Sequence, residues 1–374
     1  MPNLLPLRFK VRRTPPIDVA VEHPPAQPFD PCRTCTGSCI HRHGAGCFAT
    51  PKVRSRYWLT LSIMIGLSAL FAFGLLAWGN PMPFGTPGFW LIAERRATAI
   101  IVMAIVALAQ AMATVTFQTV TNNRIVTPSI MGFEALYMVI QTSVVFFFGA
   151  AGLAAFSGTW QFITQVILMV GMSLVLYGWL LTGRFANIQV MLLVGIVIGG
   201  GLGSLSTFMR RLLSPSEFDV LTARMFGSVT NAKTEYLWLA IVLVLAATLG
   251  IVLRAKVLNV VSLGADLANN LGINHRHASI YFLVLVSVLM AVSTALVGPM
   301  TFLGFLVATL TYQFADTYDH RAVLPMATIG AFLVLTSAYF VMNHIFYAQG
   351  AVSIIIELVG GSLFLFVLLR KGRL

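Results

Sequence analysis

The chain has 374 residues, of which 58% are hydrophobic and only 10% are charged. This composition excludes a water-soluble globular protein and predicts an integral membrane protein. The formal net charge of +12 could indicate a nucleic-acid partner. The basic residues instead flank the apolar runs, as the positive-inside rule expects of cytoplasmic loops, so no nucleic acid is predicted as a partner.

Residues 1–56 are polar, proline-rich and basic, and they show neither a helical nor a strand period. We expect a disordered cytoplasmic extension here, followed by a membrane domain over residues 57–374. No signal peptide is predicted, because the charged start is not followed by an apolar run and a small-residue cleavage site. An alternative is that translation starts downstream and the extension is not always made.

All four cysteines lie in this extension, two of them in a C-x-x-C pair, and thiolates with imidazoles at short spacing can bind zinc. The longer steps to the other two cysteines match no closed zinc site, so a metal site is the weaker alternative. No metal is predicted in the membrane domain. The candidate ligands are Cys32, Cys35, Cys39 and Cys47, with His41 and His43 close by.

Ten apolar segments follow the extension, and most are long enough to cross roughly 30 Å of hydrocarbon as helices. We therefore predict an all-α membrane protein with about ten transmembrane helices. The eighth segment is short. The segments are 57–78, 98–120, 130–149, 160–182, 188–208, 236–253, 279–297, 302–314, 323–342 and 352–369.

Charge placement gives the orientation of these spans. If the N-terminus is inside, most of the 24 lysines and arginines lie on the inner side, and the bias persists when the first six basic residues of the extension are left out. Both termini are therefore predicted to be cytoplasmic. The basic residues left outside are Arg95, Arg96, Arg210, Arg211, Arg224 and Lys233.

The stretch SLGADLANNLGI, Ser262–Ile273, is the longest clearly helical polar interruption between two spans. Ser262 can cap a helix, Asp266 falls in its first turn where the helix dipole favours an anion, and Gly272 can end it. This predicts a short amphipathic helix on the cytoplasmic side.

Three leucines of this stretch repeat every fourth position and form one apolar stripe: Leu263, Leu267 and Leu271. The pattern fits two interpretations. One is a connecting loop that happens to be helical. The other is a docking helix for a separate motor subunit.

Arg95 and Arg96 stand at the outer mouth of the second span. One interpretation is interfacial snorkelling, which is common for an arginine at a helix end. The other is a cationic contact for the acidic surface of an extracytoplasmic partner.

The loop before the third span reads QTVTNNRIVTPSIMGFEALY over residues 118–137. Pro128 cannot continue a helix and Gly132 permits close backbone packing, so we expect a sharp re-entry corner. Glu134 follows in the first turns of its span, and Glu357 occupies a similar position in the last span. Both are interpreted as structural, because a proton-coupled carrier would need deeper acids paired with a base.

The fifth predicted span carries a small residue at every fourth position, and such a face lets helices approach closely. These residues are Gly195, Gly199, Gly203 and Thr207. Near the C-terminus, residues 295–325 contain Gly298 and Pro299 and then a turn, Asp319 to Arg321, which is interpreted as a solvated inner loop.

Several of these motifs, in this order, resemble the FecCD-type iron-chelate permeases of ABC importers. Residues 262–273 resemble the family's LG-x-x-x-A-x-x-LG element. The segment 118–137 resembles its Q-x-x-x-RNPLADP-x-x-LG loop, with Gln118, Asn123, Pro128 and Gly132 on family positions. The segment 295–325 resembles its GPI-x-F-x-GL-x-x-PH signature, although Ala308 and Thr309 replace the usual Pro-His. The TNNR form of the loop is similar to the branch that serves catecholate siderophores.

The resemblance implies a type II ABC importer permease fold in the bacterial cytoplasmic membrane. It implies three partner proteins besides membrane lipid: an ATPase, an extracytoplasmic siderophore-binding protein, and a second permease subunit that is identical or a paralogue. No phosphate-loop motif is present in this sequence, so ATP and magnesium would belong to the ATPase and this chain would be neither an enzyme nor a cofactor carrier.

The resemblance also implies roles for individual residues. Arg95 and Arg96 would dock the binding protein, and the small-residue face of the fifth span would line the translocation path. The coupling helix in the ATPase groove would comprise Leu263, Gly264, Ala265, Asp266, Leu267, Ala268, Leu271 and Gly272.

The predicted function is the translocation of a ferric siderophore of the catecholate type, without naming the siderophore. Alternatives are a vitamin B12 or haem permease of the same architecture, or a proton-coupled secondary carrier. Dependence of uptake on a partner ATPase separates the carrier from the other two.

Overall fold

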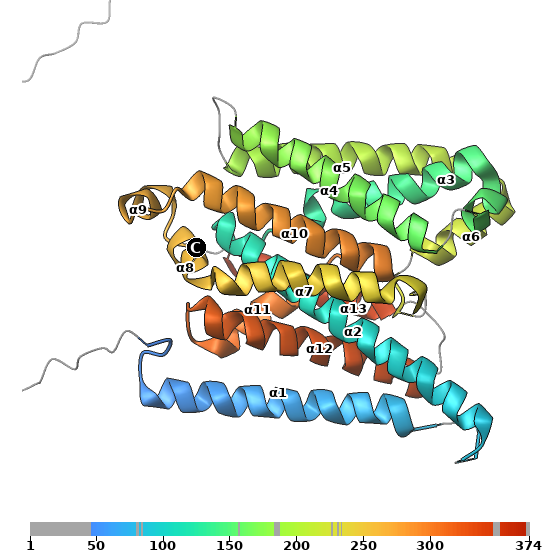
Figure 1. The fold of residues 1–374 in the computed structure, drawn as a ribbon, viewed down its shortest axis with the longest axis horizontal. Helices are drawn as coiled ribbons and strands as arrows, with labels where there is room; N and C mark the ends of the chain where they lie inside the picture. The colour runs from blue at the N-terminus through green and yellow to red at the C-terminus, as the bar shows by residue number, and fades with distance from the viewer. Residues whose placement is uncertain are drawn as a thin grey trace, which may run out of the picture. The chain divides into compact units, whose positions relative to one another are not determined.

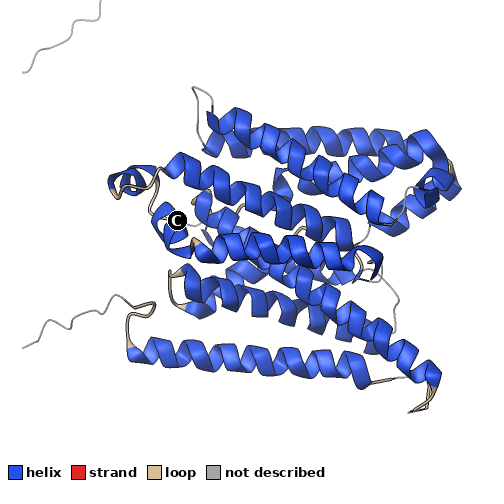
Figure 2. Ribbon diagram, viewed as in Figure 1, coloured by secondary structure: helices blue, strands red, loops and turns tan. Residues whose placement is uncertain are grey.

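The computed structural model describes residues 46–371, except 80, 81, 84, 156, 157, 183–187, 226, 230, 231, 233 and 347–351. Within these ranges every regular element is a helix (Figures 1 and 2). This confirms the predicted all-α fold class. Of the four cysteines, Cys32, Cys35 and Cys39 lie outside the described residues.

The ten predicted spans correspond to ten apolar helices of the described chain. Six are long and apolar enough to cross a membrane by length and composition, and four shorter apolar helices accompany them. The helices that match the predictions are α1 (Pro51–Ala77), α2 (Pro87–Val120), α3 (Phe133–Ala155), α4 (Thr159–Thr182), α5 (Ile188–Arg211), α7 (Leu237–Leu253), α10 (His275–Val297), α11 (Leu303–Ala315), α12 (His320–His344) and α13 (Val352–Lys371).

Short elements complete the order and lie between these spans. They are η1 (Pro128–Met131), α6 (Pro215–Met225), η3 (Thr234–Tyr236), α8 (Ala255–Val261) and α9 (Ala265–Asn270).

The helices α1 and α2 begin more than one turn earlier than predicted, and in both the cause is a local capping motif. The hydroxyl of Thr50 accepts from the amide of Val53, and Pro51 fills the first helical position, so α1 includes residues 51–56 that were assigned to the extension. Thr86 and Pro87 start α2 in the same way. Threonine caps followed by proline favour a helix start even where the next residues are polar.

Helix α2 crosses the middle of the helix assembly and is its most enclosed span (Figure 1). Its second half is rich in alanine, and small side chains let α10 and α12 pack closely along it. In contrast, α1 and α5 bury few side chains within the chain. The core therefore lies around α2 and α10, and α1 and α5 present large apolar surfaces outward.

Candidate functional site

The predicted coupling stretch folds as a helix, but not from the residue that was expected to cap it. Ser262 ends α8, and its hydroxyl donates to the carbonyl oxygen of Asn259 at 2.6 Å. The N-cap position of α9 is occupied by Gly264, which has φ +93° and lacks a side-chain acceptor. The predicted Ser262 cap is wrong, because the hydroxyl is already bonded to the preceding helix.

The predicted helix stop is confirmed. Gly272 has φ +80°, and its amide donates to the carbonyl oxygen of Asn269 at 3.0 Å. The amide of Ile273 donates to the carbonyl oxygen of Ala268 at 3.0 Å. This pair of bonds is the Schellman pattern that glycine favours after a helix. Asp266 lies in the first turn of α9, as expected.

Helix α9 projects at one end of the helix assembly, beyond α8 and α10 (Figure 1). Leu263, Leu267 and Leu271 are 52%, 54% and 62% exposed. Ala268 is buried, so it fixes the element to the rest of the chain from the other side. The described part of the chain therefore leaves about half or more of each leucine in the stripe uncovered.

A polar network supports the base of this segment and was not predicted. The amide of Asn259 in α8 donates to the Asp319 carboxylate at 2.9 Å, and its oxygen lies 2.5 Å from His320 Nδ1. The other ring nitrogen of His320 lies 2.6 Å from the hydroxyl of Thr119 in α2. These contacts join α8, α12 and α2 immediately before α9.

The prediction of a solvated loop at residues 319–321 is therefore wrong for His320, which is only 5% exposed. Asp319 caps α12 by accepting from the amide of Arg321 at 3.0 Å. Burial raises the pKa of Asp319, but hydrogen bonds from Cys47 and Asn259 outweigh it, so the pKa lies below its usual value.

Cys47 is a free thiol that donates to Asp319 Oδ2 at 2.7 Å. The hydroxyl of Thr317 donates to the carbonyl oxygen of Cys47, and the ring of Phe48 lies 5.0 Å from that of Tyr57. The last residues of the predicted extension are therefore packed on the end of the bundle where α12 begins. In the part of the chain that the structure describes, no three His, Cys, Asp or Glu side chains are grouped to hold a metal ion.

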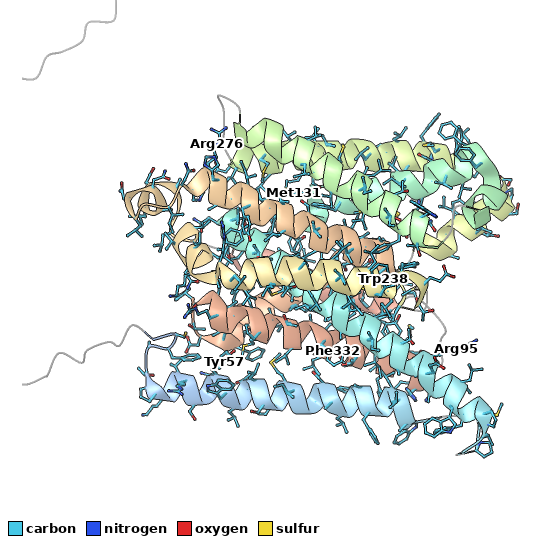
Figure 3. The ribbon with its side chains drawn as sticks, viewed as in Figure 1. Tyr57, Arg95, Met131, Trp238, Arg276 and Phe332 are labelled. Atoms are coloured by element: carbon cyan, nitrogen blue, oxygen red, sulfur yellow. The ribbon has the colours of Figure 1, made fainter. Side chains whose placement is uncertain are left out.

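The two outer arginines have different surroundings. The guanidinium of Arg96 donates to the carbonyl oxygens of Leu75, Leu76, Trp78 and Gly79 at 2.8 to 3.3 Å. It therefore binds the orphan carbonyls that end α1. Arg95 is exposed, at the end of α2 away from α9 (Figure 3). Of these two arginines, Arg95 is thus the exposed cation, whereas Arg96 is held by the end of α1.

The re-entry corner is confirmed. Pro128 opens η1, and Gly132 follows with φ +96° before α3 begins. Asn123 shapes the approach by accepting from the amide of Ile125 at 2.9 Å, which is an Asx turn. Gln118 donates to the carbonyl oxygen of Arg124 at 2.8 Å, so it holds the same loop.

The small-residue face of α5 divides into two parts. A Cβ on Gly199 would lie 2.9 Å from Gly132 Cα, and one on Gly195 would lie 2.8 Å from Met131 Cε. These two glycines therefore receive the re-entry corner, with Met131 labelled in Figure 3. One turn further, Gly203 has no atom within 4 Å of such a Cβ, and Thr207 is exposed. In the part of the chain that the structure describes, nothing outside α5 lies within 4 Å of a Cβ at Gly203.

The third motif forms a second tight corner. Gly298 ends α10 with φ +94°. A Cβ on Gly227 would lie 2.5 Å from the Pro299 carbonyl oxygen, so sequence analysis missed Gly227 as a packing residue. Thr301, at the same corner, donates to Glu134 Oε2 at 2.5 Å, which joins this loop to the first turn of α3.

The sequence model of a family described as the FecCD transport family matches residues 56–370 of this chain. The petrobactin import system permease protein FatC of Bacillus anthracis is 53% identical over 339 residues, covering 90% of this chain and 96% of that protein. The petrobactin import system permease protein YclO of Bacillus subtilis is 37% identical, covering 85% and 99%.

A solved inward-facing structure of a metal-chelate type ABC transporter has the same fold. It superposes with a TM-score of 0.73 at 19% identity, covering 85% of this chain and 99% of its own. The family match and the similarity of full-length relatives agree with the order of motifs along the helices. The chain belongs to the FecCD transport family.

Proposed function

We propose that this chain is the permease subunit of an ABC importer that carries a ferric siderophore of the catecholate type, such as petrobactin, across the bacterial cytoplasmic membrane. The observation that carries the proposal is the 53% identity to a petrobactin import permease over 96% of that protein. Both termini are cytoplasmic in this proposal, and a partner ATPase hydrolyses ATP.

The geometry supports a division of roles between the two ends of the bundle. The exposed leucines of α9 provide an apolar contact for the ATPase at one end. At the other end, Arg95 provides a free cation for the siderophore-binding protein. The unpartnered part of α5, with Gly203 and Thr207, faces a second permease subunit and the translocation path between them.

The substrate is tested by uptake in cells that lack this chain and express it from a plasmid. The chain should restore accumulation of iron supplied as ferric petrobactin, and it should not restore uptake of haem or vitamin B12. Restored uptake of haem or vitamin B12 alone would assign the chain to one of those substrates. Uptake that persists without the partner ATPase would identify a secondary carrier instead.

Arg95→Glu is expected to weaken capture of the loaded binding protein. Because exposed charge pairs are screened by salt, the loss should be larger at low ionic strength than at 0.5 M salt. Binding of the labelled protein to the reconstituted importer measures this. Arg96→Gln is the control, which should lower the melting temperature by uncapping α1 and have less effect on docking. Equal docking by Arg95→Glu and the unaltered protein at low salt would contradict the role of Arg95.

A further inference from the structure

An apolar groove of about 290 Å³ lies between α1 on one side and α11 and α12 on the other. Ile63 and Met64 of α1 line one wall, and Phe314 and Leu333 line the other. Figure 1 shows α1 at the edge of the assembly beside α12. The groove is thus on the periphery of the bundle, away from the α5 face proposed for the second subunit.

Two hydroxyl groups line the groove, and each donates its proton within its own helix. Thr60 Oγ1 donates to the carbonyl oxygen of Arg56 at 2.9 Å, and Thr311 Oγ1 donates to the carbonyl oxygen of Val307 at 2.8 Å. Both hydroxyls are therefore satisfied by their own helices. The remaining lining is apolar, so the groove is suited to a hydrocarbon chain and not to a polar metabolite.

The position of the groove in the membrane supports the same occupant. The outward surface of α1 exposes large apolar side chains along most of its length, among them Leu59, Leu70 and Phe73. A span with this surface is in contact with lipid. Acyl chains are therefore the apolar molecules present at the groove.

A pair of cations continues the groove toward the cytoplasm. Arg56 precedes Thr60 by one helical turn and Lys52 precedes Arg56 by another, so the three share one side of α1. Both cations are exposed. Trp58, 55% exposed, marks this level as the membrane interface, where tryptophan is enriched.

Nearby charges do not cancel these cations. Asp316, two residues beyond Phe314, is the acid nearest in sequence to the groove, and α1 provides two cations against it. The negative charge of Asp319 has a cation of its own in the neighbouring Arg321. The apolar groove thus has positive charge at the end that lies at the membrane interface.

We propose that this groove binds an anionic phospholipid, with an acyl chain between α1, α11 and α12 and its phosphate at Arg56 and Lys52. The site is separate from the surfaces used in the proposed function and does not depend on the substrate.

The test uses the purified full-length chain together with the subunits that co-purify with it. Phosphatidylglycerol or phosphatidylcholine, with identical acyl chains, is titrated into this sample. Native mass spectrometry counts bound lipids. A basic residue near the surface favours an anionic lipid by about fivefold, so the unaltered protein should prefer phosphatidylglycerol by at least that factor. Arg56→Gln should reduce the preference by about fivefold.

Arg54→Gln is the matched control, because Arg54 is exposed on the same turn but lies about 200° around the helix from Arg56. It should leave the preference unchanged. Thr60→Phe fills the groove and should reduce binding of both lipids. Equal affinity for the two lipids, equal effects of Arg54→Gln and Arg56→Gln, or unchanged binding by Thr60→Phe would each overturn the proposal.

Discussion

Replacing Leu267 by aspartate is expected to weaken attachment of the partner ATPase by more than tenfold and to abolish siderophore uptake. A buried leucine contributes about 1.5 to 3 kcal/mol of transfer free energy. An aspartate buried at the same place in the contact with the ATPase adds a desolvation cost. The substitution should leave the permease itself intact, because this side chain is 54% exposed in the chain alone. Co-purification of the ATPase, uptake in cells and thermal melting of the isolated permease measure the three effects.

Two variants on the same short helix separate loss of the leucine from change of charge. Asn270→Asp adds the same negative charge at an exposed position, and Asp266→Ala removes a helix-dipole contact that contributes about 0.3 to 1 kcal/mol. Both should retain most of the ATPase. If Leu267→Asp retains both attachment and uptake, α9 is a connecting helix and the coupling assignment is wrong.

Gly199→Leu is expected to prevent stable folding of the membrane domain. A Cβ at this position would lie 2.9 Å from the Cα and 3.1 Å from the amide nitrogen of Gly132. Both are backbone atoms at a corner with φ +96°, so they cannot move away as a flexible side chain could. Overpacking a tight interior typically costs about 1 to 3 kcal/mol, and occasionally more. The loss should appear as aggregation or a much lower melting temperature in detergent.

Gly203→Leu is the matched control on the same helix, one turn away, where nothing lies within 4 Å of the added carbon. It should leave the isolated chain folded, since leucine is the better helix former by nearly 1 kcal/mol. A Gly199→Leu protein that melts like the unaltered chain would show that the corner can separate from α5 without cost.

The number and order of the spans could be predicted because span length and apolarity are local properties. All ten predicted segments match helices, including the short eighth segment, which is α11. The start of α1 was placed too late because Lys52, Arg54 and Arg56 make its first turn look like part of the polar extension. The family resemblance, read from motifs and their order, is confirmed by the match over residues 56–370.

Contacts between distant residues could not be predicted in this way. The environment of Asp319 depends on Asn259, 60 residues earlier, and on Cys47, 272 residues earlier. Likewise, sequence position cannot tell which of Arg95 and Arg96 faces the end of α1. The leucine stripe of α9 could be predicted, because an apolar repeat in a polar loop is itself a local signal. Its role in coupling stays a prediction.

The length of α2 affects where Arg95 lies relative to the lipid. Its 34 residues extend about 51 Å, whereas the hydrocarbon layer is about 30 Å thick. Transmembrane helices tilt by at most about 40°, at which this helix would still span roughly 39 Å. Part of the helix must therefore lie outside the hydrocarbon layer, and the charged side chains of Glu94, Arg95 and Arg96 favour its first turns for this part. In the proposed orientation Arg95 then lies at the level of the headgroups, where a soluble protein at the membrane surface can contact it.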